Sequence, residues 1–142
     1  MIAGGGAPAG ATMTRSSDKR GASAGFVRRS AAVPTAPVAA GRFTETQVLI
    51  GPAEGAPNFA MRRFIKGAGG GMPRHTNRVE HEQYVLCGRA RISIGDERFE
   101  VAAGDVVFIP AGTPHDYEVL EAPFEFLCMV PNREDRIHIL DP

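Results

Sequence analysis

The sequence is poor in features that mark several large classes of protein. It contains two cysteines, Cys87 and Cys128, in 142 residues, and two cysteines are too few for the disulfide framework of a small secreted domain. No apolar run approaches the roughly 20 residues that a membrane-spanning helix needs. We therefore expect a cytoplasmic protein of one domain, without a membrane partner.

Net charge is also lacking, because 16 basic residues balance 16 acidic ones. The distribution is uneven. Residues 1–42 hold six basic side chains and one acidic side chain, whereas residues 43–142 hold ten basic and fifteen acidic ones. Domains that bind nucleic acid are usually basic. The acidic balance of residues 43–142, and a leader without a helix-turn-helix pattern, argue against nucleic acid as a partner.

Residues 1–42 are rich in Ala and Gly, and Phe26 is their single aromatic residue. Such a segment cannot bury enough apolar surface to offset the entropy lost on ordering. We predict a disordered tail over residues 1–42 and a folded domain over residues 43–142. An organellar transit peptide and a true start at Met13 are alternatives. A twin-arginine signal at Arg28-Arg29 is disfavoured, because large apolar residues are scarce after it.

From about residue 42, short β-rich runs alternate with turn residues, and no helical period lies between them. Alternation places Ala90, Ile92 and Ile94 on one face of a strand and charged or polar residues on the other. The sequence therefore predicts an all-β sandwich or barrel. The expected strands are Thr46–Ile50, Asn58–Ile65, Glu82–Leu86, Ala90–Ile94, Glu97–Val101, Val106–Ile109, His115–Leu120 and Phe124–Val130, with turns that include residues 67–71, 87–88 and 122–123.

Three of the four histidines lie in two short segments. Residues 71–88 contain His75, Asn77 and His81, and residues 104–115 end at His115. His75 and Asn77 are two residues apart, so an extended strand projects both from one face. Neutral imidazole is the commonest ligand of transition metals in proteins, and inward positions of neighbouring strands meet across a small barrel. The pattern predicts a metal site with open coordination positions.

The two segments resemble the paired motifs of the cupin family, G-x5-H-x-H-x3,4-E-x6-G and G-x5-P-x-G-x2-H-x3-N. The second motif is matched through its histidine and departs at its final asparagine, where this chain has Val119. Its matching residues are Gly104, Pro110, Gly112 and His115.

The first motif is matched at His75 and Gly88. Asn77 stands at the position of the second histidine, and His81 stands at the position of the glutamate. Val79-Glu80-His81-Glu82 is similar to a subgroup of cupins with H-x-H-x-x-E-H-E, which uses that histidine as a ligand. Either neighbouring glutamate could orient an imidazole, and the alternative is a solvated charge at a strand edge.

The resemblance covers roughly residues 43–131. It implies a double-stranded β-helix (jelly-roll) barrel around one divalent transition metal, typically Fe, Mn, Ni, Zn or Cu. The implied metal ligands are His75, Asn77, His81 and His115. Because this set holds no anionic side chain, the metal would keep its full charge and favour anionic, chelating substrates. Many small cupins form dimers, so we expect a homodimer.

Candidate substrate contacts come from strand positions. Arg62 and Arg63 alternate faces, so one of them can point into the barrel as an anion anchor, and we take Arg62 as the candidate. Two exposed arginines are the alternative. Tyr117 and Phe126 are candidate pocket walls, although core aromatics would follow the same pattern. His138 is interpreted as a surface residue, and no residue is assigned a catalytic role.

The expected function is a mononuclear metal-dependent enzyme of dioxygenase type that acts on a small anionic or chelating metabolite. Three neutral histidines would leave two or three positions for a bidentate substrate and dioxygen. The first alternative is a non-redox metal-dependent isomerase, cyclase, decarboxylase or lyase. The second is a barrel that binds or senses a small ligand without turnover.

Overall fold

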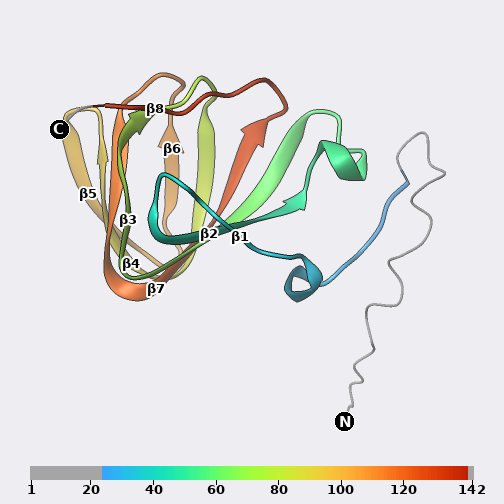
Figure 1. The fold of residues 1–142 in the computed structure, drawn as a ribbon, viewed down its shortest axis with the longest axis horizontal. Helices are drawn as coiled ribbons and strands as arrows, with labels where there is room; N and C mark the ends of the chain where they lie inside the picture. Colours follow the sequence, from blue (N-terminus) through green and yellow to red (C-terminus); the bar gives the residue numbers. More distant parts are fainter. Residues whose placement is uncertain (1–23, 141–142) are drawn as a thin grey trace, which may run out of the picture.

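The computed structural model describes residues 24–140, which form strands and two short 3-10 turns (Figure 1). The predicted all-β jelly-roll barrel is confirmed. Within this described range, no helix is long and apolar enough to cross a membrane. The elements are η2 (Ser30–Ala32), β1 (Ala36–Pro37), β2 (Arg42–Ile50), η3 (Pro52–Glu54), β3 (Phe59–Thr76), β4 (His81–Ile94), β5 (Glu97–Ala102), β6 (Val106–Ile109), β7 (His115–Pro131) and β8 (His138–Ile139).

All strand pairs are antiparallel, and the main path through the sheet is β1-β2-β3-β7-β4-β5. Besides β7, β4 pairs with two different strands along its length. Its first part, from His81 to Tyr84, pairs with β6, and its second part, from Arg89 to Ile94, pairs with β5. β3, β4 and β7 curve so that the sheet folds over itself (Figure 1). We call the interior that this fold encloses the lumen of the barrel; it contains the side chains of Ile92, Tyr117 and Phe126.

Three predicted turns prove to be bends inside continuous strands. The runs Glu82–Leu86 and Ala90–Ile94 are two parts of β4, the last two predicted runs join in β7, and residues 67–71 lie within β3. The physical reason is clearest at Gly88, which has a φ of +83° in β4. A Cβ atom at this position would lie 2.1 Å from the carbonyl oxygen of Pro123 in β7. Glycine thus allows a close backbone approach here without ending the strand.

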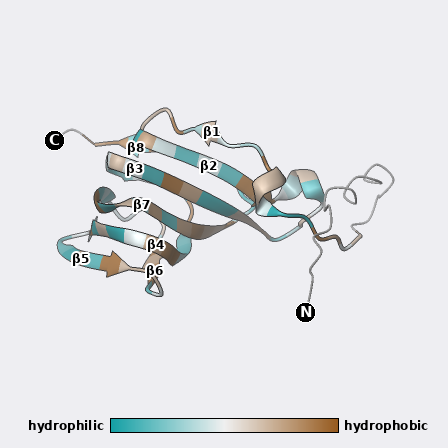
Figure 2. Ribbon diagram, turned by 90° about the horizontal axis from the view of Figure 1, so that it is seen from below, coloured by the Kyte–Doolittle hydropathy of each residue, from teal (hydrophilic) through white to brown (hydrophobic). Residues whose placement is uncertain are grey.

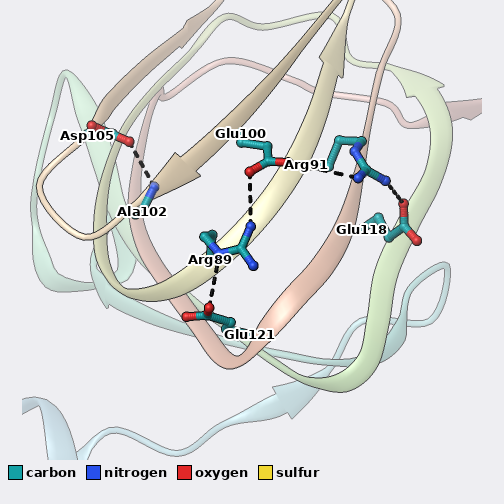
Figure 3. A network of polar contacts seen from close by, with 7 residues as sticks. All are labelled: Arg89, Arg91, Glu100, Ala102, Asp105, Glu118 and Glu121. Atoms are coloured by element: carbon teal, nitrogen blue, oxygen red, sulfur yellow. Dashed lines mark hydrogen bonds and ion pairs between the residues drawn. The ribbon is translucent and has the colours of Figure 1, made fainter.

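Hydrophobic and hydrophilic residues alternate along the strands (Figure 2), as predicted. Ala90 and Ile92 are fully buried in β4, whereas Arg89 and Arg91 lie on the opposite face. Figure 3 shows that these arginines bind carboxylates on both neighbouring strands. Exposed ion pairs of this kind contribute about 0–1 kcal/mol each. The stability of the barrel therefore comes mainly from its apolar interior.

The predicted disordered tail over residues 1–42 is wrong for residues 24–42. β1 pairs with β2, and Val33 is buried. The side-chain amide of Gln47 donates hydrogen bonds to the carbonyl oxygens of Ser30 (2.9 Å) and Val33 (2.7 Å). Long-range polar contacts therefore hold a segment whose composition is unfavourable for a core. The prediction for residues 1–23 lies outside the described residues.

The bend in β4 can be tested by comparing two glycines with similar φ values. Gly88→Ala adds a methyl group against the backbone of β7, whereas Gly104→Ala (φ +93°) adds one to open space. We expect Gly104→Ala to cost about 1–2 kcal/mol for its left-handed conformation and Gly88→Ala to cost several kcal/mol more. Urea denaturation of both variants gives the two free energies of unfolding. Equal losses would contradict the close approach at Gly88.

Candidate metal centre

Three strands bring the predicted histidines together in the lumen. His75 lies near the end of β3, His81 begins β4 and His115 begins β7. All three side chains are buried. The ring centroids of His75 and His115 are 4.2 Å apart, and those of His81 and His115 are 5.6 Å apart. The sequence prediction that these residues meet is confirmed.

In two of the imidazoles a backbone carbonyl oxygen binds Nδ1 and leaves Nε2 as the atom that could bind a metal. Nδ1 of His75 lies 2.7 Å from the carbonyl oxygen of Pro73, and Nδ1 of His115 lies 2.8 Å from that of Thr113. A carbonyl oxygen only accepts, so Nδ1 carries the proton in both rings. Each neutral ring then keeps a lone pair on Nε2, which is the usual way in which such a hydrogen bond prepares a metal ligand.

His81 has a different environment. Its Nδ1 lies 3.4 Å from a guanidinium nitrogen of Arg62 and 3.4 Å from Sγ of Cys128. Its Nε2 is buried and has no hydrogen-bond partner among the described residues. Because Arg62 can only donate, ligation through Nε2 would require the sulfur of Cys128 to accept the proton on Nδ1. Nε2 of His81 is therefore the polar atom in this cluster that most needs a partner.

Burial keeps the imidazoles neutral. It lowers the pKa of His75, lowers that of His115 to about 4, and, together with the positive charge of Arg62, lowers that of His81 to about 3. Imidazole binds metals in its neutral form. The lumen therefore holds its histidines in the form that binds a metal over the whole neutral pH range.

Asn77, the fourth predicted ligand, is buried but bonded elsewhere. Its side-chain NH2 donates to a carboxylate oxygen of Asp135 (2.8 Å), and the other oxygen of Asp135 accepts from the backbone N–H of Arg78 (2.7 Å). Asn77 thus ties the segment after β7 to the end of β3. Glu82 alternates with His81 along β4 and lies on the opposite face of that strand, so it does not orient the His81 ring.

The three imidazoles are chemically suited to bind a divalent transition metal. Three neutral imidazoles, of which two have oriented Nε2 lone pairs and one has a buried Nε2 without a partner, are ligands that such ions prefer. Their donor atoms do not surround one point: among the described residues, no group of three or more His, Cys, Asp or Glu side chains has the arrangement of a bound ion. Closing the site on a metal would need the rings to turn.

The predicted substrate contacts also line the lumen. Arg62 points inward, where Nη2 donates to Sγ of Cys128 (3.1 Å), and its guanidinium lies 4.9 Å from the ring centroid of Phe64. Arg63 points outward to Glu125 and Gln47. The rings of Tyr117 and Phe126 are stacked, with centroids 5.4 Å apart. One arginine inward and one outward agrees with the alternation seen in the sequence.

Two buried polar residues of the lumen were missed by the sequence analysis. Gln83 donates to the hydroxyl of Tyr117 (2.6 Å), and Lys66 is only 1% exposed. A signal existed for both. Gln83 lies two residues after His81, and Lys66 lies four residues after Arg62, so strand alternation places each on the same face as its predicted neighbour.

Lys66 is buried without a carboxylate. Its Nζ donates to Oγ1 of Thr44 (3.3 Å) and lies 4.9 Å from the ring centroid of Tyr117. Burial, and to a lesser extent the charge of Arg42, lowers the pKa of Lys66 to about 7. No ion pair among the described residues includes Lys66 or Arg62. The lumen therefore contains two basic side chains that no carboxylate of residues 24–140 neutralises.

Comparison with known proteins points to the same family that the two sequence motifs resemble. Residues 62–130 match the family model described as the cupin domain. The structure resembles that of the polyketide cyclase RemF from Streptomyces resistomycificus, with a TM-score of 0.77 and 26% identity over 84% of this chain and 87% of that chain.

Two curated relatives match shorter segments. An uncharacterised protein of Methanocaldococcus jannaschii is 40% identical over 50 residues, which are 34% of this chain and 40% of that protein. Quercetin 2,3-dioxygenase of Bacillus subtilis is 39% identical over 54 residues, which are 37% of this chain and 16% of that enzyme. The chain thus matches well under two thirds of the length of either relative.

The role of Asn77 can be measured by a double-mutant cycle with Asp135. We expect Asn77→Ala and Asp135→Ala to be coupled by about 1 kcal/mol in the free energy of unfolding, because each removes the same hydrogen bond. Asn77→Ala should leave the metal affinity within about twofold of that of the unaltered chain. A large loss of metal affinity without coupling to Asp135 would instead make Asn77 a ligand.

The burial of Lys66 predicts a pH-dependent stability. The pKa of Lys66 falls from its ordinary value of 10.5 to about 7 in the fold. Between these pH values the unfolded chain binds the extra proton, so the free energy of unfolding increases as the pH rises. Lys66→Met removes the free-energy cost of burying an amine that is protonated in the unfolded chain. We expect it to stabilise the fold by a few kcal/mol at pH 6.5 and by much less at pH 10, as measured by urea denaturation. The exposed Arg98→Met variant is the control and should show no such trend.

Proposed function

Because the chain belongs to the cupin family, we propose that it is a metal-dependent enzyme whose ion is held by His75, His81 and His115. The proposed activity is of dioxygenase type, on a small anionic or chelating metabolite. The metal would be a divalent transition ion such as Fe, Mn, Ni, Zn or Cu.

One observation carries the proposal. Nε2 of His81 is buried without a protein partner, and it lies beside two imidazoles that keep their Nε2 lone pairs. A buried polar atom without a partner costs about 1–3 kcal/mol, so the buried Nε2 of His81 calls for a partner, and the Nε2 lone pairs of His75 and His115 could bind the same partner. A shared metal ion would satisfy all three.

The remaining residues have definable tasks. A bound ion would supply Lewis acidity and, if redox-active, electron transfer. The carbonyl oxygens of Pro73 and Thr113 fix two imidazole rings. Arg62 presents a positive charge to an anionic substrate in a region of low dielectric, where such an interaction is strengthened. The aromatic rings of Tyr117 and Phe126 limit the space next to His115.

The dioxygenase type is supported by the 39% identity of a 54-residue segment to quercetin 2,3-dioxygenase. A second candidate is non-redox metal-dependent chemistry of the cyclase kind. It is supported by the likeness to the polyketide cyclase RemF, which extends over 84% of this chain. The two candidates require the same ligands and differ in whether the reaction consumes dioxygen.

Metal content and oxygen consumption test the proposal together. We expect about one ion per chain, with at least a tenfold loss of affinity in His75→Ala and in His115→Ala. The exposed His138→Ala variant is the control and should bind metal normally. Elemental analysis and isothermal titration measure these quantities. Substrate-dependent oxygen uptake would support the dioxygenase type, and turnover without uptake would support the cyclase kind.

The pH dependence of metal binding follows from the same ligands. Protons compete with the metal only near and below the pKa values of the imidazoles in the metal-free fold, and burial lowers these to about 4 for His115 and about 3 for His81. The affinity for the metal should therefore stay nearly constant as the pH drops from 7 to about 5 and should fall as the pH drops through 4. Metal content that stays constant down to pH 3 would show that histidines do not dominate the site.

A further inference from the structure

Three side chains meet at the sulfur of Cys128, which is 1% exposed. Nη2 of Arg62 lies 3.1 Å from this sulfur, Nδ1 of His81 lies 3.4 Å from it, and Nε2 of Gln83 lies 3.6 Å from it. They come from two strands, because Arg62 is in β3 while His81 and Gln83 are in β4. The sulfur thus gathers three polar side chains into one small region of the lumen.

Each of these three side chains keeps a second polar atom that is buried and has no hydrogen-bond partner in the described chain. The atoms are Nε of Arg62, Nε2 of His81 and Oε1 of Gln83. Buried polar groups of native proteins are nearly always paired, so that each exception calls for an explanation. Three exceptions on side chains that share one contact atom indicate that partners from outside the chain bind at this place.

The proposed metal accounts for Nε2 of His81. The chemistry of a second partner can be deduced from the two remaining atoms, on Arg62 and Gln83. Nε of Arg62 is a cationic donor, and Arg62 forms no ion pair among the described residues. A guanidinium in this state favours a carboxylate. The free end of the Gln83 amide favours a hydroxyl, which can donate or accept and therefore pairs with the amide in either orientation.

We propose that the lumen recognises a hydroxy carboxylate, with the carboxylate on Arg62 and the hydroxyl on Gln83. The assignment rests on the proposed function only in giving His81 to the metal. It makes Gln83 a specificity residue, since a ligand without the hydroxyl leaves the amide unpaired in a dry site. Sites built to bind a hydroxyl discriminate strongly against analogues that lack it.

The test uses glycolate and acetate as probes on the metal-free protein. Glycolate is the smallest hydroxy carboxylate, and acetate lacks only the hydroxyl, so size does not decide the result. Titration is followed by nuclear magnetic resonance of the Arg62 Nε–H and the Gln83 side-chain amide. We expect saturable shifts of both groups with glycolate and about tenfold weaker binding of acetate, which should move Arg62 alone.

Two variants and one control assign the contacts. Gln83→Met should weaken glycolate binding to the level of acetate and leave acetate unchanged. Arg62→Gln should abolish the binding of both probes. Arg63→Gln alters the neighbouring arginine, which points out of the barrel, and should change neither affinity. Equal affinities for the two probes, or a Gln83→Met variant that still prefers glycolate, would overturn the proposal and leave water as the partner of these atoms.

The failure of this inference can be told apart from the failure of the proposed function. His75→Ala should lose metal binding and still bind glycolate in the metal-free state. A chain that binds metal normally but does not distinguish the two probes would overturn only the hydroxy carboxylate. A chain that prefers glycolate but binds no metal would overturn only the metal-dependent function.

Discussion

The site depends on the bend of β3 more than on any single contact. Arg62 and His75 are 13 residues apart on this strand, a separation that would span about 40 Å if the strand were straight. Nδ1 of His81 nevertheless lies 3.4 Å from a guanidinium nitrogen of Arg62. The ring centroid of His81 is also 5.6 Å from that of His115, and His115 pairs with His75 in the sheet. The two ends of one strand therefore face the same lumen. Close backbone approaches such as that of Gly88 to Pro123 allow the partner strands to follow the same curve.

Alternation predicted much of this arrangement, because the period of a strand is a local property. The inward faces of β4 and β7 and the meeting of the three histidines were predicted correctly. Features that depend on distant residues were not. A glycine such as Gly88 is typical both of a turn and of a bend inside a strand. The close approach of the Pro123 carbonyl, which makes it a bend, comes from a distant part of the chain. The spacing of Asn77 does not reveal that its NH2 group binds a carboxylate 58 residues away, and its role as a metal ligand stays a prediction. The homodimer, the cytoplasmic location and the small-molecule partner stay predictions.

The charge of the lumen is the second property that links the fold to its chemistry. Burial keeps the imidazoles neutral and lowers the pKa of Lys66 to about 7, while Arg62 keeps its charge beside Cys128. A cation in the same space would add to this positive potential, and an anion would relieve it. Metal and anionic ligand should therefore favour each other's binding, because each reduces the electrostatic cost of the other.

The segment before β1 has a consequence for how the chain can be shortened. Residues 30–33 accept both hydrogen bonds of the Gln47 amide, and the same side chain accepts from Arg63, which also binds Glu125 on β7. A chain that began at Met13 would keep all of these contacts. Cleavage after Val33 would leave the Gln47 amide without its acceptors, while β1 would still pair with β2. An affinity tag or fusion partner is therefore best joined well before residue 28, because Nη2 of Arg28 donates to the carbonyl oxygen of Leu49.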